Sequence, residues 1–274
     1  MHPLRTLRVG AVPYLVGRPL IDGLADEPGF ELGFDVPALL VERLRRAELD
    51  VALVSSIELF RRPGYGYLAG SAIAGSGFVA SVQVFLNKPV EALTTLALDP
   101  ASRTAQALAQ VMLARAARRD GRSPPRAFEP EAGATAEAAG ADAWLSIGDP
   151  ALARTLGPGA PPSFNPSAAW TETFALPFVF AAWVVRPGVS LDTAQVRAFA
   201  RARERGTRPG ALAALAAEGA AKWNLPLAAC ERYLALECRY DPGVDFAPAL
   251  RRFRDEAAQL GLADGALEPA MQGD

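Results

Sequence analysis

The sequence predicts an α/β fold of two lobes with a ligand cleft between them. Short apolar runs typical of buried strands alternate with segments of helical periodicity, which favours a mainly parallel sheet. The chain is expected to cross between the lobes near residues 87–90 and 178–182. Polar residues follow several strands, at the edge where open α/β sheets bind ligands.

Runs of Val, Leu, Ile and Phe, bounded by Pro, Gly or polar residues, predict the strands. The first run ends at Pro13-Tyr14, and the run before Gly148 is closed by Asp149-Pro150. In chain order, the expected strands are 7–12, 30–36, 50–54, 66–74, 81–87, 93–98, 127–128, 143–147 and 178–185.

Apolar residues three and four apart, together with start signals, predict the helices. Pro19 falls in a first turn, where proline is tolerated, and Asp192 and Pro209 are suitable starting residues. The expected helices are 16–24, 37–47, a short one from 57, 102–119, a weak one at 131–139, a short one after 150, 192–205, 209–222, 226–236 and 245–260. A loop is expected at 157–168, and disorder in the last few residues. The first lobe would comprise residues 1–88 and 182–274, and the second lobe residues 89–181.

Composition excludes several classes of function. The 274 residues are half apolar and carry a formal net charge of −2, so neither nucleic acid nor an anionic membrane is expected as a partner. The longest apolar run, 178–185, is too short to span a bilayer. The start of the chain reads as a strand and not as a secretory signal, so a cytoplasmic location is expected.

Histidine and cysteine are scarce. His2 is the only histidine, which removes a Ser-His-Asp triad and a histidine-based zinc site from consideration. Cys230 and Cys238 have neither a zinc spacing nor a disulfide pattern, so a reducing compartment is expected.

A strand-to-helix corner at residues 98–104 is the main candidate for an anion site. Ser102 or Thr104 is suited to cap the helix that follows, and the free N–H groups of a first turn favour a carboxylate or a phosphate. Arg103 adds a guanidinium that binds carboxylates through two hydrogen bonds. The alternative is an ordinary capped helix with a solvated arginine.

Other strand ends carry hydroxyls, an acid or backbone that a ligand could approach closely. Together they suit a small carboxylate better than a nucleotide, because no Gly-rich phosphate loop is present. Asp149 either hydrogen-bonds a ligand hydroxyl or caps its own helix. The candidates are Tyr14, Ser55, Ser56, Ser81, Ile147, Gly148 and Asp149.

An aromatic group surrounds the last apolar run. It contains Trp170, Phe174, Phe178, Phe180 and Trp183. Strand alternation sends Phe178 and Phe180 to one face, which either belongs to the core, the commoner outcome, or lines a pocket.

Several short motifs follow one another at characteristic distances over about residues 7–186. They are Val9–Leu15 with Arg18-Pro19-Leu20, Asp50–Glu58, Ser81-Val82 with Val84-Phe85, Leu98-Asp99-Pro100 with Ser102-Arg103-Thr104, Ile147-Gly148-Asp149, and Leu176–Ala181 with Trp183. In order and distance this set resembles the chorismate dehydratase family of the futalosine route to menaquinone. The resemblance implies a type II periplasmic-binding-protein-like fold and removal of water from chorismate to give 3-[(1-carboxyvinyl)oxy]benzoate, without organic cofactor or metal.

One position departs from the family pattern. The residue after Tyr14-Leu15 is normally an asparagine implicated in catalysis, whereas Val16 neither donates nor accepts a hydrogen bond. Either another donor replaces the amide, or turnover is weak, or the protein binds a related ligand without converting it.

With no internal histidine available as a base, we expect a substrate carboxylate to take the ring proton. Ser81 and Asp149 are the expected catalytic residues, and Asp149 is the alternative base. A hydro-lyase is the main hypothesis; a non-catalytic protein for a small aromatic or dicarboxylate ligand is the second, and an enzyme making 1,4-dihydroxy-6-naphthoate the last. The expected substrate contacts are Tyr14, Val16, Ser55, Ser56, Ser102, Arg103, Thr104, Ile147, Gly148, Trp170 and Phe178.

Overall fold

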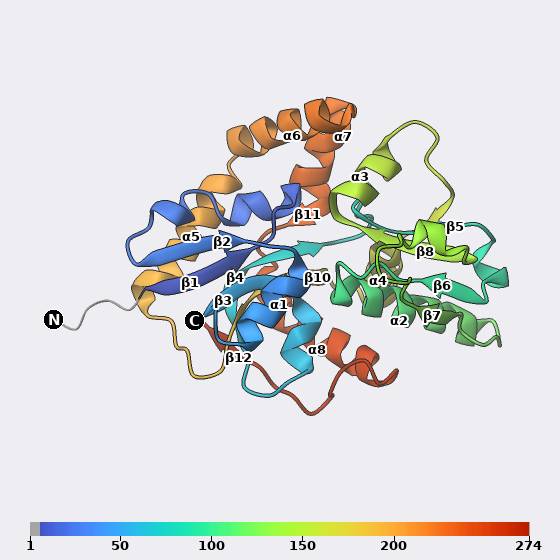
Figure 1. Cartoon of the computed structure of the whole chain (residues 1–274), viewed down its shortest axis with the longest axis horizontal. Coiled ribbons are helices and arrows are strands. Elements are labelled where there is room, and N and C mark those ends of the chain that lie inside the picture. The colour runs from blue at the N-terminus through green and yellow to red at the C-terminus, as the bar shows by residue number, and fades with distance from the viewer. Residues whose placement is uncertain (1–5, 274) are drawn as a thin grey trace.

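The computed structural model describes residues 6–273 and contains two β-sheets, each flanked by helices (Figure 1). The first, seven-stranded sheet has the order β11-β4-β10-β3-β1-β2, with β12 beside β4. β1, β2 and β3 are parallel, whereas β10 runs antiparallel to both of its neighbours. Its strands are β1 (Leu7–Ala11), β2 (Phe30–Phe34), β3 (Val51–Ser55), β4 (Gly66–Gly75), β10 (Phe178–Val185), β11 (Cys238–Arg239) and β12 (Ala270–Gln272).

The second, five-stranded sheet has the order β7-β6-β8-β5-β9. β6 is parallel to β7 and β8, and β5 is antiparallel to β8 and β9. Its strands are β5 (Val82–Leu86), β6 (Thr95–Ala97), β7 (Arg126–Phe128), β8 (Ala143–Ile147) and β9 (Ser163–Phe164).

The α-helices pack around both sheets. In Figure 1, α2, α3 and α4 accompany the second sheet, and α1, α5 and α8 the first. The bounds are α1 (Pro37–Arg45), α2 (Arg103–Arg119), α3 (Gly148–Leu156), α4 (Pro166–Phe174), α5 (Thr193–Gly206), α6 (Pro209–Trp223), α7 (Leu227–Arg232) and α8 (Phe246–Ala258).

Shorter turns connect these elements. Those of the 3₁₀ type are η1 (Leu15–Leu20), η2 (Leu24–Asp26), η3 (Ser56–Phe60), η4 (Val90–Ala92), η5 (Glu137–Ala139) and η7 (Gly243–Asp245), and η6 (Tyr233–Glu237) is a π-helical turn.

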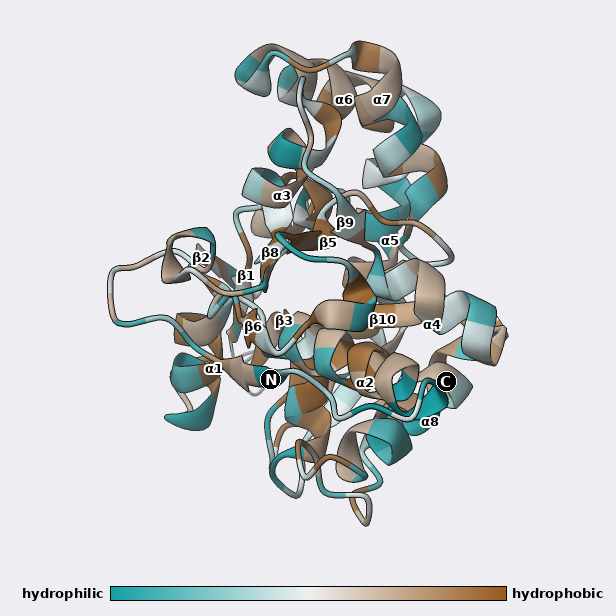
Figure 2. Cartoon of the chain, turned by 90° about the vertical axis from the view of Figure 1, so that its right-hand side faces the viewer, coloured by the Kyte–Doolittle hydropathy of each residue, from teal (hydrophilic) through white to brown (hydrophobic). Residues whose placement is uncertain are grey.

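The core lies within and around the sheets. Figure 2 shows hydrophobic colour concentrated on strands such as β3 and β10, whereas the outer helices carry hydrophilic stretches. Leu53, Val54 and Trp183 are wholly buried, because both faces of the first sheet are covered.

Each run expected to be a strand contains one, but several helices differ. The segments 16–24 and 57 onward contain 3₁₀ turns in place of α-helices. In η1, Gly17 weakens a helix, and Pro19 lacks the N–H that an α-helical bond would use. The region 131–139 contains only a short turn of helix, beside two glycines with positive φ, Gly133 and Gly140.

Two expectations of irregular structure are wrong. The loop at 157–168 contains β9 and the start of α4, whose N-cap is Asn165 with Pro166 following. The side chain of Asn165 accepts a hydrogen bond from Ala168 N at 2.8 Å, a start signal visible in the sequence. Near the C-terminus, Ala270–Gln272 pairs with β4 and is therefore ordered sheet.

The strand pairing bears on the lobe limits. β5 lies within the expected first lobe but pairs in the second sheet, and the whole of β10 pairs in the first. The chain crosses between Gly75 and Val82 and returns through α4 to Phe178. We therefore propose lobe limits that follow the sheets, near residues 76–81 and 175–177.

Candidate functional site

A cavity lies where the edges of the two sheets face each other. From the first sheet it receives the carboxyl ends of β1, β3 and β4 and the amino end of β10. From the second it receives the start of β5 and the residues that follow β6 and β8. The free volume of the cavity is about 70 Å³, which is room for a few water molecules. The two lobes therefore lie close together.

Seven of the expected site residues line this cavity. They come from both lobes, although they are spread over more than a hundred positions of the chain. The seven are Tyr14, Val16, Ser55, Ser81, Ser102, Ile147 and Gly148.

Two helix N-termini reach the cavity from the second lobe. Ser102 caps α2, and its Oγ accepts a hydrogen bond from Ala105 N at 3.3 Å. α3 begins at Gly148, whose N–H donates to the carbonyl of Ser81 at 2.9 Å. The free N–H groups and dipoles of both first turns favour an anion here.

Gly148 is favoured by its backbone conformation and lies against Tyr14. Its φ of +68° lies in the left-handed region, which side chains rarely adopt. An added Cβ would lie 3.4 Å from the ring of Tyr14. The tyrosine of the first lobe therefore packs directly on the start of α3.

The remaining wall is apolar, and the cavity lining within residues 6–273 contains no Lys, Arg, Asp or Glu. Phe180, Val79 and Ile73 provide much of this surface, and Cys238 enters from β11. Phe180 could be anticipated from the strand alternation, but no sequence signal placed Cys238 at the site. An anion here would depend on backbone N–H groups and hydroxyls, not on a paired cation.

Carboxyl groups lie just outside this wall. Burial raises the pKa of Asp99, although its carboxylate accepts hydrogen bonds from Ala101 N and Ile147 N at 2.9 and 3.1 Å. Burial, together with the charges of Asp99 and Asp149, raises the pKa of Tyr14. Tyr14 is thus a neutral phenol at pH 7, able to donate a hydrogen bond.

Asp149 does not line the cavity in the described part of the chain. Its Oδ1 accepts a hydrogen bond from Leu15 N at 3.2 Å, which joins α3 of the second lobe to η1 of the first. Burial raises the pKa of Asp149, although this bond and the charge of Lys222 act in the opposite direction. The carboxylate therefore has a structural partner of its own.

The residues of the corner at 102–104 have different surroundings. Only Ser102 faces the cavity, whereas Thr104 Oγ1 accepts from Ile57 N at 3.0 Å and lies 3.4 Å from Ser56 Oγ. Ser56 Oγ also donates to Val179 O at 2.7 Å. Thr104 and Ser56 are thus buried links between α2 and η3, not cavity walls.

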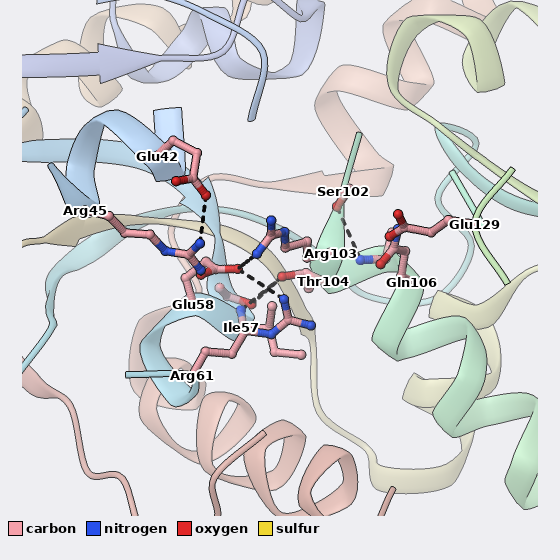
Figure 3. Close-up of polar contacts among 12 residues, drawn as sticks. Glu42, Arg45, Ile57, Glu58, Arg61, Ser102, Arg103, Thr104, Gln106 and Glu129 are labelled. Carbon is pink, nitrogen blue, oxygen red and sulfur yellow. Dashed lines mark hydrogen bonds and ion pairs between the residues drawn. The ribbon is translucent and has the colours of Figure 1, made fainter. Parts of the chain in front are cut away.

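Arg103 also points away from the cavity, toward Glu58. Its Nη1 lies 3.6 Å from Glu58 Oε1, and Figure 3 shows Arg45 and Arg61 turned toward the same carboxylate. Arg45 Nη2 donates to Glu58 Oε2 at 2.7 Å, and Arg61 Nη1 lies 3.6 Å from Oε1. Arg103 thus takes part in an ion pair between the lobes, because Glu58 on η3 faces the start of α2, and its contact with a ligand stays a prediction.

Trp170 and Phe178 are core residues. Both are wholly buried, and their rings meet edge to face at 5.1 Å. Phe253 of α8 lies 4.9 Å from Phe178, and Trp170 Nε1 donates to Pro177 O at 3.3 Å. Their neighbours on α8, far along the chain, close off the face that a pocket would need.

The two sheets and the cavity between them make up a periplasmic-binding-protein-like fold. A Candida albicans protein described as having the generic periplasmic binding protein fold has a TM-score of 0.54 and 12% identity, with 99% of each chain covered. The aliphatic sulphonate binding protein SsuA of Escherichia coli has a TM-score of 0.64 and 18% identity, covering 99% of this chain and 94% of its own. Protein AF1704 from Archaeoglobus fulgidus has a TM-score of 0.68 and 17% identity, covering 96% of this chain and all of its own.

Sequence comparison narrows this class to one family. Residues 7–259 match a family model described as menaquinone biosynthesis. A chorismate dehydratase of Thermus thermophilus is 31% identical over 216 residues, which cover 71% of this chain and 78% of the relative. The chain belongs to the chorismate dehydratase family of menaquinone biosynthesis.

No helix within residues 6–273 combines the length and apolar character needed to cross a membrane. In the same part of the chain, no three His, Cys, Asp or Glu side chains are grouped so that they could hold a metal ion. Cys230 and Cys238 are buried free thiols.

Proposed function

We propose that this protein is a chorismate dehydratase, a hydro-lyase that converts chorismate to 3-[(1-carboxyvinyl)oxy]benzoate. Membership of the family supports the choice of reaction. The observation that carries it is the pair of helix N-termini, at Ser102 and Gly148, facing a mainly apolar cavity that receives no charged side chain from residues 6–273. Chorismate carries one carboxylate on its carbon ring and one on its enolpyruvyl arm, which matches two anion sites beside an apolar wall.

In this proposal the chain binds and orients, and the substrate supplies the base. The lobes part to admit chorismate, which is larger than the present free space. The ring then lies against Phe180 and Ile73, and the carboxylates lie at the starts of α2 and α3. A carboxylate of the enolpyruvyl arm takes the ring proton, the C–H electron pair forms the new ring double bond, and the C–O bond breaks. The leaving hydroxide takes a proton and departs as water, leaving an aromatic ring. Positioning within a closed cavity is what such a favourable reaction requires.

Ser81 and Tyr14 supply hydroxyl donors in this arrangement. Both line the cavity, one at the start of β5 and the other after β1. A preorganised donor directed at developing charge stabilises a transition state more than a ground state. We assign Ser81 to the leaving hydroxyl or its neighbouring carboxylate, where charge changes during the reaction.

Asp149→Asn is expected to retain turnover within about fivefold of the unchanged protein. The amide oxygen still accepts the hydrogen bond from Leu15 N, so the contact between lobes survives. Steady-state kinetics with chorismate measure this, with Asp149→Ala as the matched variant that lacks the acceptor. Loss of turnover in Asp149→Asn, with the Kd for chorismate unchanged, would identify Asp149 as the base instead of the substrate.

Arg103→Ala is expected to weaken chorismate binding by no more than about threefold, the effect of losing a partly exposed ion pair. The reason is that Arg103 faces Glu58 and not the cavity. Isothermal titration calorimetry gives the Kd. Arg61→Ala is the matched control, since Arg61 lies at the same 3.6 Å from Glu58 but within the same lobe. If Arg103→Ala alone weakened the Kd for chorismate more than about tenfold, the loss would have the size of a charge-assisted hydrogen bond to the ligand. Arg103 would then be a residue of the binding site.

The function is tested by incubating the purified protein with chorismate. Ultraviolet absorbance follows the conversion, and mass spectrometry identifies a product lighter by one water molecule. Binding without conversion would favour the non-catalytic alternative, a result to which Val16 could contribute because it brings no hydrogen-bonding group to the lining. If the protein neither binds nor converts chorismate, the proposal is overturned.

A further inference from the structure

A π-helical turn late in the chain is hydrogen-bonded to the segment that contains Ser81. The turn, Tyr233–Glu237, follows α7 directly and precedes β11. Tyr233 Oη donates a hydrogen bond to Ser81 Oγ at 2.8 Å, and Glu237 Oε2 accepts one from Ala80 N, also at 2.8 Å. Turns of this kind are rare and frequently mark functional sites. Two side chains of one turn thus hold two consecutive residues at the edge of the cavity.

The hydrogen bond from Tyr233 determines which hydrogen bonds Ser81 can still make. A serine hydroxyl has one proton to donate and two lone pairs. Tyr233 occupies a lone pair, and the Ser81 carbonyl is occupied by Gly148 N at 2.9 Å. The hydroxyl proton of Ser81 is then left for a partner in the cavity, which Ser81 lines.

We infer that Tyr233 is a positioning residue, which orients the Ser81 hydroxyl so that it donates to the substrate. The inference rests on the proposed function. Tyr233 does not line the cavity within the described residues, so it acts through Ser81 and not by contact.

The surroundings of Tyr233 suit this role. The side chain is almost wholly buried, and burial raises its pKa well above the usual range, so the phenol keeps its proton. Burial also raises the pKa of the neighbouring Cys238 to about 12, which leaves that thiol neutral. The donor to Ser81 is therefore present throughout the working pH range.

Tyr233→Phe tests the inference, with Tyr240→Phe as its matched control. Tyr240 is also buried and has the thiol of Cys238 as its neighbour, but among residues 6–273 its hydroxyl makes no hydrogen bond to Ser81. We expect Tyr233→Phe to lower kcat for chorismate about tenfold or more, with the Kd within about twofold, because the lost orientation matters most in the transition state. We expect Tyr240→Phe to match the unchanged protein in both quantities.

A double variant separates positioning from a general structural role. If Tyr233 acts through Ser81, then Ser81→Ala/Tyr233→Phe is no slower than Ser81→Ala alone. A further loss in the double variant, of the same size as in Tyr233→Phe, would overturn the inference. Thermal unfolding of each variant establishes that the compared proteins are folded.

The outcomes also separate this inference from the proposed function. If the unchanged protein converts chorismate and Tyr233→Phe behaves as Tyr240→Phe does, only the role of Tyr233 falls. If the unchanged protein neither binds nor converts chorismate, the proposed function falls first and this role with it.

Discussion

Ser81→Ala is expected to lower kcat for chorismate about 100-fold while changing the Kd by less than about threefold, the pattern of a donor used mainly in the transition state. The hydroxyl lines the cavity beside the start of α3, and Tyr233 holds it in place. Alanine removes the hydroxyl and leaves the wall otherwise unchanged. Single-turnover kinetics give the chemical step, and calorimetry gives the Kd.

The control for this result is Ser71→Ala. Ser71 is a buried serine of β4 whose hydroxyl has no partner in the described part of the chain, and it does not line the cavity. It therefore reports the effect of removing a buried hydroxyl without touching the site. A Kd that weakens as much as kcat falls in Ser81→Ala would make Ser81 a ground-state binding group and contradict its proposed catalytic role.

Asp50→Ala is expected to lower the free energy of unfolding by about 3–5 kcal/mol, the cost of breaking a buried ion pair. Asp50 is almost wholly buried just before β3, and its carboxylate accepts from Arg8 Nε and Nη2, each at 3.0 Å. Arg186 Nη2 donates to the same carboxylate at 2.8 Å. Alanine would leave the guanidinium groups of Arg8 and Arg186 without this carboxylate. The site lies at the end of the sheet far from the cavity. Urea unfolding measures the loss, with exposed Asp26→Ala as the control.

The same group predicts a dependence of stability on pH. Desolvation raises the pKa of Asp50, but the hydrogen bonds from Arg8 and Arg186 outweigh it and bring the pKa to about 2. Because this is below the ordinary value of 3.8, the contribution is present above pH 4 and is lost as the pH falls toward 2. The shift corresponds to about 2–3 kcal/mol. Asp50→Ala should lack this part of the acid sensitivity; an unchanged pH profile would show that other carboxyls determine it.

The sequence predicted the elements better than it predicted the side-chain partners. Apolar runs such as 143–147 are strands because burial on both faces leaves few other structures open to them. The helix cap at Ser102 was also predictable, and so was the backbone at Gly148 that a ligand could approach closely. Both features depend on local backbone geometry. These local rules therefore predicted the two helix starts that now line the cavity.

The partners of Arg103, Trp170 and Tyr233 depend on tertiary contacts. Glu58 lies on another lobe from Arg103, and nothing in the local pattern distinguishes a ligand carboxylate from a protein one. Trp170 meets Phe253, and Tyr233 meets Ser81, across more than eighty positions of the chain. Periodicity carries no information about such pairs, so roles that depend on them could not be assigned from the sequence.

Two of the bonds between the lobes share a direction that bears on how long a product remains bound. Leu15 and Ile57 of the first lobe donate through main-chain N–H groups, whereas Asp149 and Thr104 of the second accept through side chains. In the first lobe only a proline at either position removes such a donor, whereas in the second lobe any side chain without an acceptor breaks the bond. The strength of these two contacts, and with it the residence time of a product, is therefore open to tuning mainly from the accepting lobe.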